Sequence, residues 1–270
     1  VNNTDLVFAL GKSEAAAEKF RLTADGEIGL GGANYGTDGQ VLTSAGAGAA
    51  AAWEDAGGLT FKSGGTNFSN SLIVGHSTTG TLDAATYNTV VGLTAFNSVT
   101  TADNCTMVGS NAGTSVTSGQ DQVMIGHNCG DKITTPIQNC LVGTYCGTNL
   151  VDGAGNTGMG VSTLTGAMSA SFAYNSAFGK SALESLSSGS YNIGLGINAG
   201  DNLTTGSGNI IIGTADAAAA DSARTFKVVS YDGSSTTNHI ISDSSGNMTL
   251  AADLTIGDDF LLDSDSCVLK

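Results

Sequence analysis

The 270-residue chain is poor in the residues that usually fill a globular core: 6% are aromatic and 12% charged, against 39 glycines and one proline. Its net charge of −15 argues against nucleic acid or an anionic membrane as partner, because both require clustered Lys and Arg. The absence of any apolar run of about eighteen residues predicts no transmembrane helix and no membrane insertion. The composition suits thin β-layers and predicts that much of the apolar burial occurs between chains.

Residues 1–58 are expected to form a β-rich shaft module. Strands are predicted at residues 5–10 and 20–23, with a short helical turn at residues 13–19. The stretch Gly36-Thr37-Asp38-Gly39-Gln40-Val41-Leu42, which precedes the single tryptophan Trp53, resembles a segment in the shafts of bacteriophage tail fibres. Trp53 is expected to be a buried anchor between subunits, and stacking against a glycan is the alternative.

A glycine returns every seventeen residues between residues 68 and 214, apart from one interval of nineteen. The residue before each of these marker glycines is apolar, and the residue four before it is asparagine in six of the nine copies. The marker glycines are Gly75, Gly92, Gly109, Gly126, Gly143, Gly160, Gly179, Gly196 and Gly213. The repeat asparagines are Asn88, Asn139, Asn156, Asn175, Asn192 and Asn209.

A short fixed period indicates one structural unit stacked on itself. Seventeen residues are too few for a pair of helices, but they suffice for two short strands and two turns, which make one coil of a solenoid. Asn and Gly tolerate the positive φ that a tight corner requires. At β-sheet spacing each coil would rise roughly 4.8 Å. The sequence therefore predicts a parallel β-roll of nine coils over residues 59–214.

The copies Asn175-Ser176-Ala177-Phe178-Gly179 and Asn88-Thr89-Val90-Val91-Gly92 resemble the head repeats of trimeric autotransporter adhesins of the YadA type, and similar repeats occur in bacteriophage tail fibres. The resemblance covers a little over half the chain. It implies a left-handed parallel β-roll built as a homotrimer, with the apolar edge of each coil facing the threefold axis. The pattern has departures: Cys105 and Gln122, for example, stand where asparagine is expected. The adhesin repeat is also usually shorter, which favours a trimeric roll over an adhesin as such.

Residues 215–270 are expected to form a second β-rich shaft module, with strands at 225–230, 239–242, 248–250 and 254–256. The final residues, Ser264-Asp265-Ser266-Cys267-Val268-Leu269-Lys270, resemble the opening of the intramolecular chaperone domain of phage tail fibres and endosialidases. That resemblance implies a self-cleavage junction, with Ser264 or Ser266 as the serine nearest the cleaved bond.

The cysteines admit three interpretations. Cys129 and Cys146 occupy the same repeat position one coil apart, where other copies have Ala or Thr, and we expect them to be small core residues. A disulfide is the alternative, because adjacent coils suit the Cα separation of roughly 4.4–6.8 Å that a bridge needs. A metal site is least favoured, since no Cys-x-x-Cys pair or nearby histidine completes a ligand set. The remaining cysteines are Cys105, Cys140 and Cys267.

No nucleophile, base and acid recur at a meaningful spacing, and Glu184 is the one glutamate in the repeats. The sequence therefore predicts no catalytic, cofactor or metal site. His76 and His127 each follow a marker glycine, three coils apart, and with His239 are expected at the surface.

Hydroxyl side chains recur eight and nine residues after the marker glycine, as in Thr100-Thr101 and Thr204-Thr205. They suit exposed strand ends beside a turn. A flat threonine ladder of the ice-binding kind is the alternative, although Val151-Asp152 interrupts it.

Together these observations predict an all-β, homotrimeric, fibrous and non-enzymatic protein of a viral tail fibre, located on the virion and used in host attachment. Its expected partners are two further copies of itself, other virion or filament components, and a glycan or protein receptor on the host surface. The alternative is a cellular surface filament or trimeric adhesin. A polysaccharide-cleaving spike and an ice-binding solenoid are less favoured.

Overall fold

The computed structural model describes residues 5–10, 16–31, 34–37, 40–44, 51–55, 61–135, 137–166 and 173–250. The chain divides into two compact units, Val1–Thr60 and Phe61–Lys270. The described residues form eighteen strands and no helix, so the predicted all-β class is confirmed.

The first unit consists of small antiparallel sheets. Strands β1 (Leu6–Leu10), β2 (Ala17–Leu22) and β3 (Ile28–Leu30) pair in that order, and β4 (Gln40–Thr43) pairs with β5 (Ala52–Asp55). The helical turn expected at residues 13–19 is wrong for residues 17–19, which begin β2. Pairing with β1 and β3 on its two sides gives this polar segment a strand's hydrogen bonds, which outweigh its local helix preference.

Trp53 lies in β5 and is half-buried within this unit. Its indole Nε1 donates a hydrogen bond to the carbonyl oxygen of Asn34 at 3.1 Å. A Cβ added at Gly36 would lie 2.9 Å from the Trp53 ring, so the ring covers that backbone. The tryptophan thus ties the hairpin to the segment before it, and its roles between subunits or toward a glycan stay predictions.

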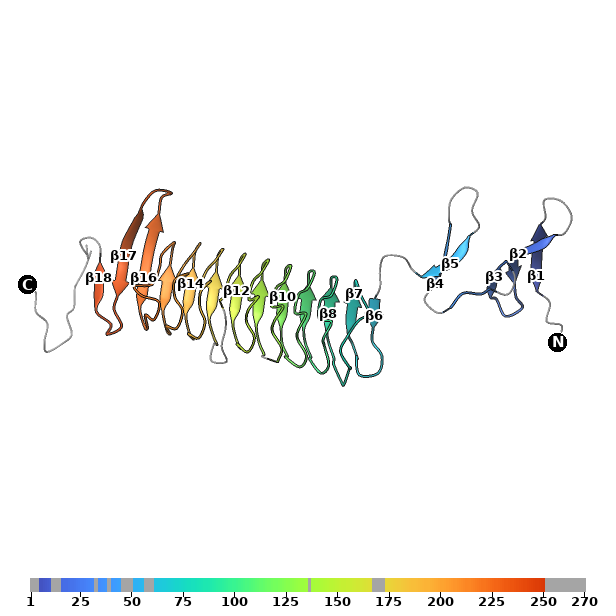
Figure 1. Cartoon of the computed structure of the whole chain (residues 1–270), viewed down its shortest axis with the longest axis horizontal. Coiled ribbons are helices and arrows are strands. Elements are labelled where there is room, and N and C mark those ends of the chain that lie inside the picture. The colour runs from blue at the N-terminus through green and yellow to red at the C-terminus, as the bar shows by residue number, and fades with distance from the viewer. Residues whose placement is uncertain are drawn as a thin grey trace, which may run out of the picture. The chain divides into compact units, whose positions relative to one another are not determined.

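The second unit is a parallel β-solenoid with one strand per coil (Figure 1). Neighbouring strands pair in parallel without slippage: Ile73 faces Val90, and Val90 faces Met107. This confirms the predicted solenoid with a spacing of about seventeen residues. The nine strands are β7 (Leu72–Val74), β8 (Thr89–Val91), β9 (Thr106–Val108), β10 (Val123–Ile125), β11 (Cys140–Val142), β12 (Thr157–Met159), β13 (Ser176–Phe178), β14 (Ile193–Leu195) and β15 (Ile210–Ile212).

Each coil contains a single three-residue strand, whereas two short strands per coil were expected. The opposite side is a chain of turns, because residues there adopt left-handed backbone conformations, such as Phe96 at φ 56° and Leu183 at φ 51°. Backbone hydrogen bonds still join these turns from coil to coil: Phe96 N donates to Ala112 O, and Leu183 N to Ala199 O, both at 3.0 Å. The second side of the coils therefore has coil-to-coil backbone hydrogen bonds, although its residues do not form β-strands.

Antiparallel strands cover both ends of the solenoid. β6 (Phe61–Ser63) pairs with β7 at one end. At the other, β16 (Phe226–Tyr231) pairs in parallel with β15, and β17 (Thr236–Ser242) and β18 (Met248–Leu250) follow as an antiparallel meander. Backbone pairing therefore continues past residue 214 into the C-terminal flank. Irregular or antiparallel end strands hinder further parallel stacking on an exposed edge.

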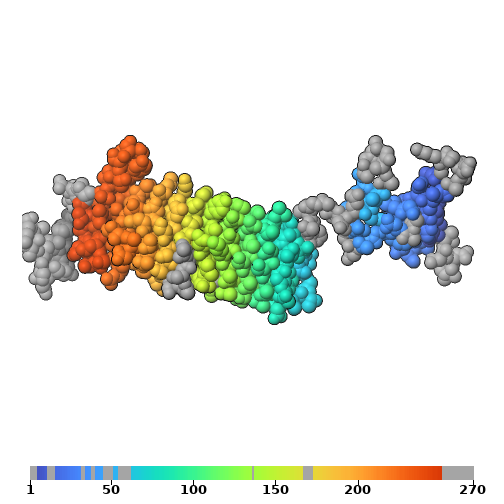
Figure 2. All heavy atoms as spheres, viewed as in Figure 1, coloured from blue at the N-terminus to red at the C-terminus, as the bar shows by residue number. Residues whose placement is uncertain are grey.

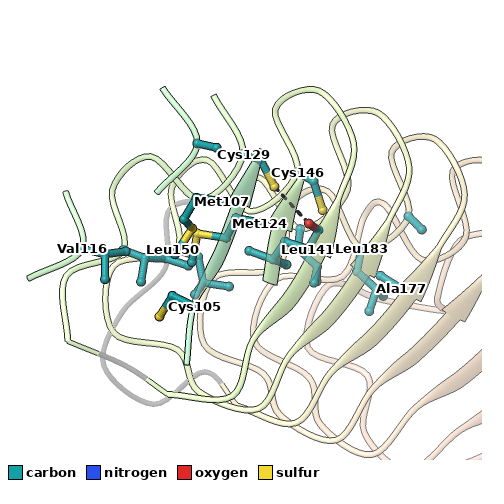
Figure 3. Packing of buried hydrophobic residues seen from close by; sticks show 14 of the residues in the cluster. Cys105, Met107, Val116, Met124, Cys129, Leu141, Cys146, Leu150, Ala177 and Leu183 are labelled. Carbon is teal, nitrogen blue, oxygen red and sulfur yellow. Dashed lines mark hydrogen bonds between the residues drawn. The ribbon is translucent and has the colours of Figure 1, made fainter. Parts of the chain in front are cut away.

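A continuous apolar core runs along the inside of the coils. Seen from outside, the coils follow one another along the solenoid in sequence order (Figure 2). Three inward rows supply most of it: the middle residue of each strand, and the residues three and seven after the marker glycine. Phe96, Leu164 and Leu183, each four after a marker glycine, are fully buried with them. Large side chains fill the space left by glycines: Met124 lies beside Gly130, and Leu183 beside Gly194. Figure 3 shows Met124 and Leu183 among the buried side chains. Burial within one chain is thus more extensive than the composition indicates.

Candidate interaction surface

The outer face of the parallel sheet carries an uncovered apolar row. In each three-residue strand the middle side chain points into the core, and its two neighbours point outward because side chains alternate along a strand. Val90 is fully buried, for example, whereas Val91 is 43% exposed. We call the residues directly before the marker glycines the outer row. It consists of Val74, Val91, Val108, Ile125, Val142, Met159, Phe178, Leu195 and Ile212.

This face is almost uncharged despite the acidity of the chain. Two further rows flank the outer row. The row three residues before the marker glycine contains one titratable side chain, Cys140, and the row one residue after it contains Lys180, His76 and His127. They also add exposed apolar side chains, including Leu93, Ile193 and Ile197. A long apolar stripe without charge is typical of a surface that another protein covers.

The two histidines of this face do not form a cluster. His76 Nε2 lies 2.6 Å from the carbonyl oxygen of Ala95. The His127 ring instead packs edge-on against Tyr145 at a centroid distance of 5.5 Å. His239 is exposed on β17 and contacts Ser230 at 2.9 Å. In the described part of the chain, no group of three or more His, Cys, Asp or Glu side chains is arranged to hold a metal ion.

The marker glycines stack directly above one another at the end of each strand. Gly92 N donates to Val74 O, and Gly109 N to Val91 O, both at 2.8 Å, and each later marker glycine is bonded to the coil before it in the same way. A Cβ added at Gly109 would lie 2.5 Å from the carbonyl oxygen of Gly126, a distance that real side chains do not adopt. The spacing of the outer row therefore depends on glycine at this corner.

The repeat asparagines form a buried ladder of amides. Asn192 N and Nδ2 both donate to Asn175 Oδ1, at 3.0 and 3.1 Å, and Asn192 Nδ2 also donates to Gly206 O at 2.9 Å. Asn209 N donates in turn to Asn192 Oδ1 at 2.9 Å. None of the six has a positive φ, so the reason given for asparagine from the sequence is wrong: the ladder needs an amide, which both donates and accepts.

Cys105 and Gln122, which take the place of asparagine in two coils, reproduce part of this pattern. Cys105 Sγ donates to Gly119 O at 3.5 Å, fourteen residues on, as Asn88 Nδ2 does to Ala102 O. Gln122 Oε1 accepts a hydrogen bond from Asn139 N at 3.2 Å. Burial raises the pKa of the Cys105 thiol to about 12, so the thiol is protonated and able to donate at neutral pH.

The residue directly before each repeat asparagine has the left-handed backbone of this corner, and its role was not predicted from the sequence. The residue five before each marker glycine has a positive φ in every coil, from Asn70 to Gly208, and Arg224 continues the row. Its amide donates to the preceding coil, as Tyr191 N does to Ala173 O at 3.2 Å. A signal was present, because Asn, Asp or Gly fills five of these nine positions; the three tyrosines obscured it.

Cys129 and Cys146 are buried as free thiols in the interior of adjacent coils (Figure 3). Cys129 Sγ donates to Leu141 O at 3.3 Å. A hydrogen bond with the Cys146 thiol and burial raise the pKa of Cys129, which keeps it protonated. The pair thus occupies the core as small side chains. Cys140 is half-buried, and Cys267 lies outside the described residues.

An acidic pair lies where the last coil meets β16. Burial, followed by a hydrogen bond with Asp216 and the charge of Glu184, raises the pKa of Asp201 to about 6. Lys227 Nζ donates to the carbonyl oxygen of Asp216 at 2.9 Å across a cavity of about 450 Å³. Carboxyl groups that share a hydrogen bond are closer than the roughly 5 Å typical of retaining glycosidases, so this pair does not fit that arrangement.

The recurring hydroxyl groups bond from coil to coil. Thr100 Oγ1 donates to Thr117 O at 3.0 Å, and Ser187 Oγ to Thr204 O at 3.0 Å. These side chains therefore contribute to stacking inside the molecule. The proposed cleavage-proximal residues Ser264 and Ser266 lie outside the described residues, as does the strand expected at 254–256.

Among the described residues, no helix has the length and apolarity to cross a membrane. Comparison of the chain with protein-family models, with curated proteins and with solved structures finds no match in any of the three.

Proposed function

We propose that the protein is a structural, non-enzymatic component of a homotrimeric fibre, of the kind found in viral tail fibres, and that it holds an attachment tip away from the particle. The observation that carries the proposal is the outer row, an apolar stripe that extends over nine coils on a face with almost no charge. The homotrimer and the fibrous form in this proposal rest on the resemblance of the repeats to those of tail fibres and trimeric adhesins.

A second copy of the chain is the partner that fits this face best. Another copy presents apolar side chains with the same rise per coil, so each coil can meet an equivalent coil along the whole length. Identical chains favour closed cyclic symmetry, which limits the assembly to a defined number of copies. The net charge of −15 on the chain, whose acidic residues lie outside this face, would keep assembled fibres apart in solution.

Function on this proposal is mechanical. Coils joined by backbone and amide ladders resist bending, and covering the outer row would make separation of the chains costly. The fibre would connect other components of the virion to a receptor on the host surface. The same geometry would serve a filament or adhesin on a cell surface, which is the second proposal for location.

Light scattering tests the assembly. The proposal predicts a mass of about 80 kDa, three times the chain mass of 26.8 kDa. Ile125 and Leu195 both point outward, so the double variant Ile125→Lys, Leu195→Lys should fold and yet shift the mass toward that of one chain. Ser185→Lys is the matched control, because Lys132 naturally occupies the same place in another coil. A monomeric wild type, or a double variant that keeps the mass of the control, would reject the homotrimer.

A further inference from the structure

Two rows of apolar side chains cross all three strands of the β1–β3 sheet in the first unit (Figure 1). Residues directly opposite one another on antiparallel strands point to the same face. One row is Leu6, Leu22 and Ile28, and the other is Phe8, Phe20 and Leu30. The Phe8 and Phe20 ring centroids are 5.9 Å apart, as expected for neighbours on one face. We call these six side chains the sheet face.

The opposite face of the same sheet is polar. Arg21 lies between Val7 and Gly29 in the register of the strands. Its guanidinium donates to Glu18 Oε1 and Oε2 at 2.8 and 2.7 Å, and to Asp5 Oδ2 at 3.0 Å. The sheet thus has the pattern of a layer that is solvated on one side and covered on the other.

The described residues of the chain leave much of the sheet face uncovered. Leu6 is 56%, Phe8 50% and Leu22 39% exposed. A sheet that is hydrophobic on one face has to bury that face against another element to be stable. The sheet face therefore needs a second layer.

The size of the sheet face limits what can form that layer. If a fully exposed Leu or Phe side chain presents roughly 200 Å², covering all six would bury about 400 Å² per chain. A stable complex between separate proteins buries roughly 800 Å² per partner. The sheet face is therefore too small to hold a freely diffusing partner, but it suffices for a partner that is already held nearby.

Sister copies joined through the outer row are partners of this kind. Residues 56–60 separate β5 from β6 in the sequence, so the first units of joined chains would remain at a high effective concentration relative to one another. The sheet face contains no charged side chain. Identical faces can therefore meet without the repulsion that a net charge of −15 creates between copies.

We propose that the sheet faces of sister copies pack against one another around the common axis, as a second interface that forms once the outer rows have joined the chains. The inference rests on the proposed function for the number of copies: with three chains, each sheet is one side of a triangular prism. It assigns the first unit a role of its own, which is to join the N-terminal parts of the chains. It also implies that the sheet is stable in the assembled protein and marginal in a single chain.

Hydrogen–deuterium exchange of the full chain, read by mass spectrometry of peptides from β1–β3, tests this interface. Leu6→Glu places a charge in the sheet face, whereas Val7→Glu places the same charge on the opposite face, directly across from Arg21. Leu6→Glu should speed exchange in β1–β3 at least tenfold relative to wild type, because a buried charge without a partner separates the sheets. Val7→Glu, the matched control, should leave the exchange unchanged. Both variants should keep the threefold mass, since the solenoid is unaltered.

The double variant Ile125→Lys, Leu195→Lys provides a second arm of the test. Its substitutions lie in the other unit, and the proposed function predicts that it yields single chains. Exchange in β1–β3 should nevertheless become at least tenfold faster, because the sister sheets are gone. A sheet that is stable by itself would keep the exchange of wild type.

Equal exchange in Leu6→Glu and Val7→Glu, or wild-type exchange in single chains of the double variant, would overturn the inference. A single-chain mass for Leu6→Glu would overturn it as well, because the sheet face would then be the main interface. Either exchange result with a threefold wild-type mass removes this interface alone. A twofold wild-type mass with the predicted exchange pattern removes the homotrimer alone, and a single-chain wild-type mass removes both.

Discussion

Glycine at the end of each strand is required by the distance between coils as well as by backbone conformation. Gly109 has a φ of 128°, which disfavours any side chain, and its Cα faces the backbone of Gly126 one coil away. Because the neighbouring atoms are backbone, they cannot rotate aside. Gly233, in the β16–β17 turn, has a φ of 98° but no atom within 4 Å of an added Cβ.

Comparing alanine at these two positions separates the two effects. Gly233→Ala should lower the free energy of unfolding by about 1 kcal/mol, the cost of a left-handed alanine. Gly109→Ala should cost at least about 3 kcal/mol, because overpacking adds to that strain. Urea unfolding at one fixed protein concentration measures both. Equal losses for the two variants would contradict the role of coil spacing.

The amide ladder makes a second prediction at the scale of a residue. Asn175→Ala would leave Asn192 N and Gly189 O without their partners in a buried place, so we expect a loss of about 1–3 kcal/mol in the free energy of unfolding. Asn238→Ala, on an exposed strand, should change it by less than about 0.5 kcal/mol. Similar small losses at both positions would show that the ladder contributes little.

At the scale of the coil, the seventeen-residue period predicted the stacking correctly, whereas the number of strands in each coil could not be predicted. A glycine every seventeen residues was enough to predict stacking, since any fixed short period places equivalent residues above one another. The sequence did not reveal that one side of each coil lacks a strand. Phe96 and Leu183 adopt left-handed backbone there, and neither residue type indicates such a conformation. Coil-to-coil hydrogen bonds overrule their local preference.

The junction between the last coil and β16 should respond to pH. The folded-state pKa of Asp201, about 6, lies above the unfolded value of 3.8, so its stabilising effect is complete below pH ~4 and is lost as the pH rises through 6. Asp216 and Glu184 face it as acids, and Lys227 as a base. Asp201→Asn should therefore stabilise the protein at pH 7.5 relative to wild type more than it does at pH 4.5. Melting temperatures at the two pH values measure this, and an equal effect of the substitution at both would contradict it.

At the scale of the whole molecule, a solenoid can have a core of its own and still leave an apolar face uncovered. Thin coils bury small side chains such as Ala112 and Ala182 completely, which is why the composition understated burial within the chain. Alternation along each strand then leaves the outer row uncovered. The sequence showed that this row is apolar, but its outward direction became visible only when the middle residue of each strand was found in the core.

The native methionines allow the central claim, that sister copies cover the outer row, to be measured without any substitution. Met159 belongs to the outer row and is 49% exposed in the single chain, while Met248 in β18 is 63% exposed and Met124 is fully buried. Dilute hydrogen peroxide converts accessible methionine to its sulfoxide, and mass spectrometry of peptides gives the rate at each position. The account predicts that Met159 in the native protein is protected like Met124 while Met248 reacts. Oxidation of Met159 at the rate of Met248 would contradict it.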